Sequence, residues 1–151
     1  MFRAHMMGAV SASALAFSAS AFAQAQSGTA TEAKAMLDKA VVAVKADKTK
    51  ALGMFLKGEG GYKDRDLYPF CFNIADGITV AAPPAVLGKD VRTLKDPTGK
   101  GFGAEIYNAA KDETYTEVSY NFPRPGDTVP ASKVSFVTKI GDLGCGVGYY
   151  K

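Results

Sequence analysis

The sequence predicts one α+β domain, because a helical pattern comes first and strand patterns fill most of the remaining chain. Between positions 29 and 57, apolar residues recur every three or four positions, as on one side of a helix. From Leu67 onwards the apolar period changes to two, which is typical of strands. Clusters of glycine and proline separate these segments and mark the turns between them.

The predicted N-terminal helix runs from Thr29 to about Lys57. Thr29 and Glu32 have the spacing of a capping box, in which each side chain accepts a hydrogen bond from the other residue's backbone N–H. The glycine-rich run 58–61 ends the helix, since glycine adopts a left-handed backbone with little strain. One side is expected to be buried, and its apolar stripe consists of Leu37, Val41, Val44, Leu52 and Phe55.

Five strands are predicted, at 67–73, 78–82, 115–122, 133–140 and 143–150. Short turns at 75–77 and 141–142 close hairpins, and the proline-rich segment 123–130 forms an exposed loop between two other strands. Between the second and third strands we expect a helical turn over 89–94 and a helix from about 101 to 111.

The last predicted strand carries glycine at three alternate positions, Gly144, Gly146 and Gly148. Because successive side chains of a strand point to opposite faces, one face has a stripe without side chains. Another part of the molecule must approach this stripe closely. A helix packed flat on the sheet is favoured over a bound ligand, because the stripe has no chemistry of its own.

The first residues predict an export signal. Arg3 supplies a positive charge, residues 6–22 form a short apolar run, and Ala21-Phe22-Ala23 fits the small-residue cleavage pattern. A retained membrane anchor is the alternative, but the run contains four serines and is shorter than the ~20 apolar residues of a span.

The expected organisation is therefore a signal peptide over 1–23, a polar leader over 24–28 and one domain over 29–151. Cleavage is expected after Ala23 or Ala25. The product would be periplasmic or secreted, with no membrane span after cleavage.

The composition argues against several classes of function. The chain has one histidine, and this residue, His5, lies in the predicted signal. A histidine-based catalytic mechanism and the usual zinc sites are therefore excluded for the exported part, and we expect no enzyme, no metal and no cofactor. Asp64 and Asp66 are interpreted as part of a solvated charged loop. With 18 basic and 15 acidic residues, the charge is too balanced to indicate a nucleic-acid partner.

Cys71 and Cys145 are the two cysteines of the chain. In an oxidising compartment an even pair usually forms a disulfide, so we expect these two to be bonded. Two buried free thiols are the alternative. A reactive thiol is disfavoured, because no histidine remains to activate it.

Several segments resemble, in order and spacing, the single Cache domain family of extracytoplasmic sensors in chemoreceptors and sensor kinases. These segments are Gly61–Tyr68, Leu87–Asp90, Leu94–Lys100, Lys133–Val137 and the terminal Gly146–Tyr149. The resemblance implies a long N-terminal helix packed on a five-stranded antiparallel PAS-like sheet, with short helices between strands 2 and 3. It also makes the first and last strands neighbours, which places Cys145 opposite Cys71.

The family further implies a pocket for small organic molecules, often short carboxylates, on one face of the sheet. Tyr68, Phe70 and Phe72 would form its aromatic wall, and Tyr120 would add a hydroxyl. Either of two lysines, Lys133 or Lys95, would supply the cation that a buried carboxylate requires. Plain core packing of the aromatic residues and solvent-facing lysines are the alternatives.

One position departs from the family pattern. Many relatives have an Ala-His-Pro step after the second strand, whereas this chain has Ala81-Ala82-Pro83. A polar pocket group is therefore missing at this position, which favours a more apolar ligand, a different ligand or none.

The predicted function is sensory: a periplasmic small-ligand-binding protein for signal transduction such as chemotaxis, which presents its ligand to a membrane receptor or sensor kinase. The alternative is a structural or protein-interaction module whose pocket is filled by its own side chains. An enzyme ranks third, since no nucleophile and base pair is recognisable.

Overall fold

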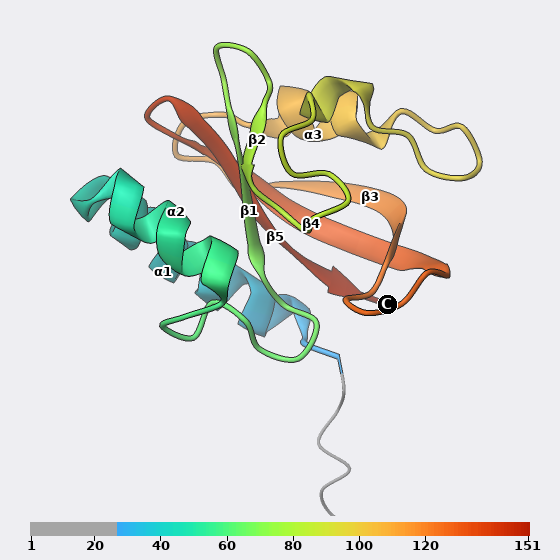
Figure 1. Ribbon diagram of the computed structural model, residues 1–151, viewed down its shortest axis with the longest axis horizontal. Coiled ribbons are helices and arrows are strands. Elements are labelled where there is room, and N and C mark those ends of the chain that lie inside the picture. Colours follow the sequence, from blue (N-terminus) through green and yellow to red (C-terminus); the bar gives the residue numbers. More distant parts are fainter. Residues whose placement is uncertain (1–26) are drawn as a thin grey trace, which may run out of the picture.

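A five-stranded sheet between two layers of helices forms the molecule, as a computed structural model of residues 27–151 shows (Figure 1). The predicted signal peptide, 1–23, and the first residues of the leader lie outside the described residues. One face of the sheet is covered by α1 (Ala30–Ala46) and α2 (Lys48–Lys57). The other face is covered by the 3-10 helix η1 (Val91–Thr93) and α3 (Phe102–Ala109).

The strands follow the spatial order β2-β1-β5-β4-β3, and every neighbouring pair is antiparallel. Their bounds are Pro69–Asn73 (β1), Thr79–Ala81 (β2), Thr116–Pro123 (β3), Pro130–Ile140 (β4) and Leu143–Tyr150 (β5). The predicted α+β class, the five antiparallel strands and the short helices between β2 and β3 are confirmed. The first and last strands are neighbours, as the family resemblance implied.

The prediction of a single helix over 29–57 is wrong in one respect, because the chain forms two helices that meet at Asp47. Asp47 has an extended backbone, donates its N–H to the Ala43 carbonyl and accepts the Lys50 N–H at its side chain. It thereby ends α1 and caps α2. A straight helix of this length would span roughly 40 Å. Because the chain turns at Asp47, α2 runs back beside α1 (Figure 1).

The predicted helix ends are confirmed. Thr29 and Glu32 form both hydrogen bonds of the capping box at the start of α1. Gly58 ends α2 with a positive φ of 68°. Of the predicted apolar stripe, Leu37, Val44 and Phe55 are buried, and Val41 and Leu52 are partly buried. The core on this face also contains small side chains, which allow the helices to approach the sheet closely. These are Ala33, Ala40 and Ala51.

The glycine stripe of β5 is filled by side chains from neighbouring strands, and the expectation of a helix packed flat on it is wrong. A Cβ at Gly144 would lie 2.3 Å from the Phe72 ring, and one at Gly146 would lie 2.6 Å from the Phe70 ring. Both aromatic residues belong to β1, which pairs with β5. The missing side chains of β5 therefore make room for large rings on the adjacent strand.

Cys71 of β1 lies directly opposite Cys145 of β5, and the two form a disulfide across 74 residues of sequence. The predicted bond is thus confirmed. Both cysteines are fully buried in the core beneath α1 and α2. The disulfide joins β5, the central strand of the sheet, to its neighbour β1.

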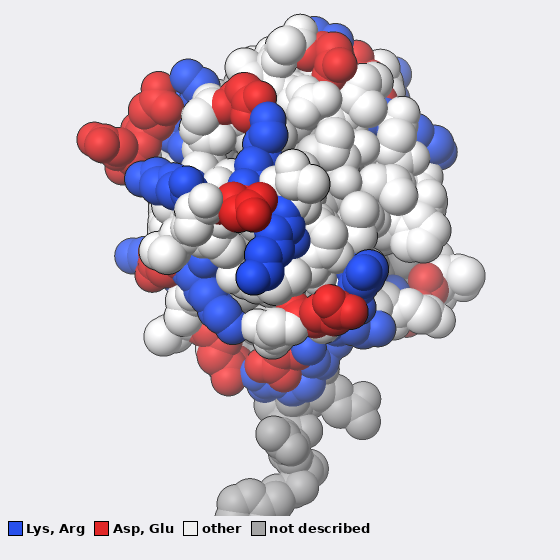
Figure 2. Space-filling view, turned by 60° about the vertical axis from the view of Figure 1, so that its left-hand side comes forward, with Lys and Arg blue, Asp and Glu red and all other residues white. Residues whose placement is uncertain are grey.

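Positive and negative side chains are interspersed on the face that the view of Figure 2 brings forward, where α1 and α2 lie. This pattern is typical of a solvated surface. Within residues 27–151, no helix combines the length and the apolar character that a membrane crossing requires.

Removing the disulfide should lower the stability of the fold. For the double substitution Cys71→Ala and Cys145→Ala, we expect the free energy of unfolding to fall by about 2–5 kcal/mol, since the unfolded chain gains the freedom of a long open loop. Urea unfolding followed by circular dichroism measures this loss. A midpoint equal to that of the oxidised wild type would contradict the expectation.

Gly144→Ala should destabilise the protein by about 1–3 kcal/mol, because the added methyl group collides with Phe72 and touches Ala110. Gly53→Ala in α2 is the matched control, since its Cβ would meet no atom within 4 Å. Alanine favours helices by up to about 1 kcal/mol over glycine, so this control should stabilise slightly. Thermal unfolding of both variants gives the comparison, and equal changes would refute the packing role of Gly144.

Candidate functional site

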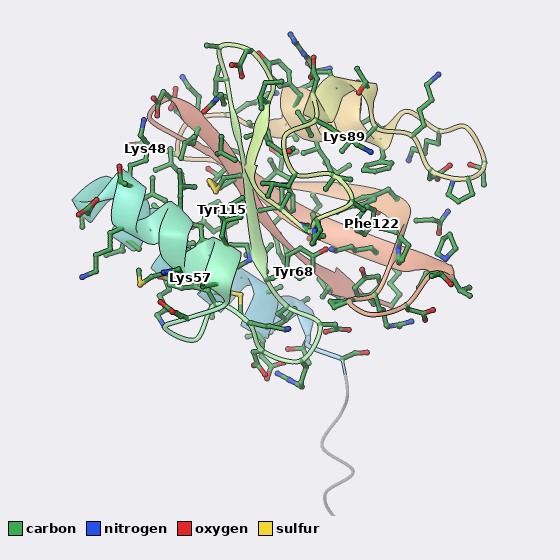
Figure 3. The ribbon with its side chains drawn as sticks, viewed as in Figure 1. Lys48, Lys57, Tyr68, Lys89, Tyr115 and Phe122 are labelled. Atoms are coloured by element: carbon green, nitrogen blue, oxygen red, sulfur yellow. A yellow bond between two sulfur atoms is a disulfide. The ribbon has the colours of Figure 1, made fainter. Side chains whose placement is uncertain are left out.

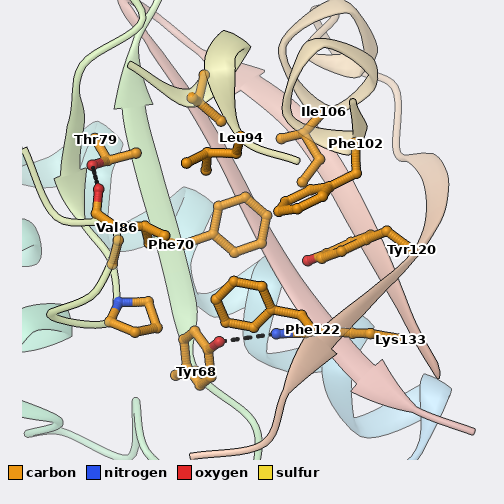
Figure 4. A pocket seen from close by; sticks show the side chains of 13 residues that line it. Tyr68, Phe70, Thr79, Val86, Leu94, Phe102, Ile106, Tyr120, Phe122 and Lys133 are labelled. Atoms are coloured by element: carbon orange, nitrogen blue, oxygen red, sulfur yellow. Dashed lines mark hydrogen bonds between the residues drawn. The ribbon is translucent and has the colours of Figure 1, made fainter. Parts of the chain in front are cut away.

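A cavity of about 40 Å³ lies between the sheet and the layer formed by η1 and α3 (Figure 4). A water molecule needs roughly 10–15 Å³ on this measure, so the space suits a ligand of only a few heavy atoms. Most of the wall is aromatic or aliphatic. The lining residues are Tyr68, Phe70, Thr79, Ala82, Pro83, Val86, Val91, Leu94, Phe102, Ile106, Tyr120, Phe122 and Lys133.

Lys133 is the one charged residue among those that line this cavity. It lies near the start of β4 and is only 1% exposed. Its Nζ donates a hydrogen bond to the Tyr68 hydroxyl at 3.0 Å (Figure 4). The same nitrogen lies 4.4 Å from the ring centre of Tyr68, 5.0 Å from that of Tyr150 and 5.3 Å from that of Phe122. Three aromatic faces thus surround the ammonium group.

Burial lowers the pKa of Lys133 to about 7, because the charged form loses its hydration, and the charge of Asp66 offsets part of this shift. No ion pair joins Lys133 to an acid within the part of the chain that the structure describes. Its hydrogen-bonding partner, Tyr68, is neutral, since burial raises the pKa of that hydroxyl. The cavity wall therefore contains an amine that forms no ion pair, and the charge of Asp66 only partly stabilises its charged form.

The side chain of Lys133 can point inward because the neighbouring strand β5 has a glycine, Gly148, beside it. A Cβ at Gly148 would lie 2.3 Å from Cε of Lys133 and 2.3 Å from Oγ of Ser135. The third glycine of the stripe thus makes room for the lysine stem, as the other two make room for aromatic rings. The glycine stripe of β5 therefore shapes both the core and the cavity wall.

Tyr120 provides a second polar group. Its hydroxyl shares a hydrogen bond of 2.8 Å with Ser135, and its ring stacks on Phe102 with the centres 4.6 Å apart. Burial raises the pKa of Tyr120, so the hydroxyl keeps its proton at neutral pH. The wall therefore offers neutral hydroxyls and one amine within an apolar surface.

Asp66 is buried, and its interpretation as part of a solvated loop is wrong. It is 4% exposed, and its Oδ1 accepts the backbone N–H of Gly28 at 2.7 Å. Its Oδ2 has no hydrogen-bond partner among the described residues and lies 3.8 Å from Nε of Arg124. The loop folds this carboxylate inward to hold the chain just before α1.

The structure brings four of the six candidate ligand residues together, since Tyr68, Phe70, Tyr120 and Lys133 all line the cavity. Phe72 is fully buried and packs against Tyr107 and Gly144 instead. The sixth candidate, Lys95, is exposed and lies outside the lining set. Only one of the two candidate lysines therefore reaches the cavity.

Sequence reasoning missed several lining residues. Phe122 follows Tyr120 by two positions in β3, so the strand period places both on one face and could have identified it. Phe102 and Ile106 of α3 also line the cavity, and nothing in the sequence showed that they face it. Among the described residues, no group of histidine, cysteine, aspartate and glutamate side chains is placed to hold a metal ion.

Three solved structures share this fold. A methyl-accepting chemotaxis protein from Vibrio parahaemolyticus RIMD 2210633 has a TM-score of 0.65 at 23% identity, over 80% of this chain and 86% of that one. The periplasmic sensor domain of a chemotaxis protein has a TM-score of 0.59 at 24% identity, over 80% and 88%. A Cache chemosensory domain, described for its recognition of carboxylic acid, has a TM-score of 0.55 at 21% identity, over 80% and 86%.

No curated protein matches this chain in a sequence comparison. The sequence pattern that defines the Cache domain, however, matches residues 34–150, which include the sheet, α2, α3 and most of α1. The fold and this match agree, and the chain belongs to the Cache domain family.

Proposed function

We propose that this protein is a sensory module that binds a short carboxylate at Lys133. One observation carries the proposal: the buried amine of Lys133, which forms no ion pair among the described residues, borders a small, largely apolar cavity. An isolated buried charge is costly, and a bound anion would remove that cost. Occupied and empty forms would therefore differ in stability, which is the basis of a ligand response.

The hydrogen-bonding capacity of the site fits a carboxylate. The ammonium group of Lys133 has three N–H donors, of which the Tyr68 hydroxyl accepts one. The other two N–H groups can donate hydrogen bonds to the carboxylate oxygens of an acid. Charge-assisted hydrogen bonds of this kind are short and strong. The aliphatic and aromatic wall would enclose the hydrocarbon end of the same molecule.

The cavity volume limits the size of the ligand. About 40 Å³ accommodates acids such as formate or acetate, and propionate would require the rings of Tyr68 or Phe122 to shift. Ala82 and Pro83 contribute no polar group to the wall, which further favours a simple acid over a hydroxylated one.

The relatives support a sensory role in the periplasm. One structural relative is the periplasmic sensor domain of a chemotaxis protein, and another recognises carboxylic acid. We extend both properties to this chain, together with export by the signal predicted over 1–23 and presentation of the ligand to a membrane receptor or sensor kinase.

Acetate or propionate should raise the thermal midpoint of the processed protein, whereas acetamide and propionamide should not, because the amides have the same shape without the charge. Lys133→Met should weaken binding of the acids at least about tenfold, as expected for loss of a buried charge partner. Isothermal titration calorimetry measures these affinities.

Lys95→Met is the matched control and should bind like the wild type, since Lys95 is exposed and away from the cavity. The ligand-free Lys133→Met protein should be at least as stable as the wild type, which separates loss of binding from loss of folding. A well-folded wild type that responds to no short acid would favour the alternative function, an interaction module without a ligand.

Affinity for the acid should fall as the pH rises above about 7, because the amine of Lys133 is then neutral in the empty protein. Binding must in that range take up a proton, so the affinity should drop by up to about tenfold per pH unit. Calorimetry in buffers of different ionisation enthalpy should detect this uptake at pH 8. A constant affinity from pH 6 to pH 9 would show that the charge of Lys133 plays no part.

A further inference from the structure

A groove of about 520 Å³ lies directly outside the cavity. The two hollows share four wall residues, Tyr68, Ala82, Pro83 and Phe122. Figure 3 shows Lys57 at the end of α2 on one side of Tyr68, and Phe122 of β3 on the other side. Only side chains of the shared wall therefore separate the groove from the cavity.

A passage is required, because Lys133 is 1% exposed and a ligand must reach it from solvent. Much of the groove wall is rigid, since five of its residues are prolines whose ring fixes the backbone angle φ. These are Pro69, Pro83, Pro84, Pro123 and Pro125. Tyr68 and Phe122, in contrast, close the partition with rings that turn about their side-chain bonds. A rotation of these two rings would therefore open the partition.

The charges around the groove are mainly positive. Lys57 and Lys63 are exposed, and their ammonium groups have no hydrogen bond or ion pair within residues 27–151. Arg124 adds a third cation with a side chain that is 38% exposed. Asp127 is the one acid among the lining residues, and its carboxylate already accepts the backbone N–H of Thr128.

The position of Lys63 is fixed by the end of α2. Gly58 has a positive φ of 68°, and a Cβ there would lie 2.9 Å from Cβ of Lys63. The stem of this lysine thus packs across the helix end, and Lys57 and Lys63 both line the groove. Both charges face the same opening that leads to the shared wall.

We propose that this groove is the entrance for small anions, which Lys57, Lys63 and Arg124 attract and which Tyr68 and Phe122 admit to Lys133. This inference rests on the proposed function for its ligand class. Positive charges at an opening raise the local concentration of anions and their rate of entry, whereas they change the final affinity little. The entrance therefore adds a kinetic preference for anions to the affinity provided by Lys133.

The test measures access without any ligand. Lys133→Cys places a thiol in the cavity, and both native cysteines are bonded to each other, so it is the one free thiol. Iodoacetate and iodoacetamide, which have nearly the same size and shape with and without a negative charge, alkylate this thiol with loss of iodide and report the entry of an anion and of a neutral molecule. Thr79→Cys, at another lining position, is a second reporter if the first fails to fold.

In this background, Lys57→Glu with Lys63→Glu should slow iodoacetate about fivefold or more at low salt and should leave the rate of the neutral iodoacetamide nearly unchanged. Lys34→Glu with Lys45→Glu is the matched control, because the net charge changes equally and both lysines line a different hollow. The control should leave both rates nearly unchanged. Equal effects of the two pairs would overturn the steering role.

Phe122→Ala should accelerate both reagents by a similar factor, since it widens the passage without changing the charge. If it leaves both rates unchanged, the shared wall is not the route of entry. These outcomes are independent of acid binding. A protein that binds no acid but shows the charge-dependent rates would refute the proposed function and keep the entrance, whereas acid binding with charge-independent rates would do the reverse.

Discussion

The pairing of β1 with β5 is the constraint on which the rest of the structure depends. On one side of this pair, Cys71 and Cys145 are bonded in the core beneath the helices α1 and α2. On the other side, the rings of Phe70 and Phe72 lie over the glycine stripe. A shift of one residue would exchange the two faces and would separate the cysteines. The disulfide and the glycines therefore require the same register.

The same stripe connects packing with chemistry. Gly148 lets the stem of Lys133 pass across β5, so that the ammonium group ends among aromatic rings next to the cavity. This placement is costly for a charge, as the lowered pKa of Lys133 indicates. A position that costs stability in the empty protein is a position where a matching ligand has a large effect. This arrangement supports the proposed binding of small anions.

Affinity and access are assigned to different residues. Lys133 lies inside and, in the proposed function, sets what is held, whereas Lys57 and Lys63 line the groove and are proposed to set what arrives quickly. The rings of Tyr68 and Phe122 stand between these two sets of charges. This separation allows selection by charge at two stages, because entry depends on the long-range field and retention depends on direct contact.

The sequence by itself determined the class of fold, the strands, the helix ends and the disulfide. These features depend on local patterns, namely the apolar period, turn residues, a capping box and a cysteine count. Four of the residues that line the cavity were also named from the sequence. Strand period and family resemblance place two of them, Tyr68 and Lys133, on the cavity face. The break at Asp47 was missed, because a helical period continues across it and the burial of Ala51 and Phe55 depends on partners distant in sequence.

Only the tertiary structure decided which side chains meet. It placed Lys133 rather than Lys95 in the cavity, turned Asp66 inward and showed that aromatic rings and a lysine stem fill the glycine stripe. It also placed the groove beside the cavity, through residues from α2, β1, β3 and the loop after β2. Such contacts join segments far apart in the chain. The physical reason is that burial and electrostatic environment depend on the packing of several elements, which no local pattern specifies.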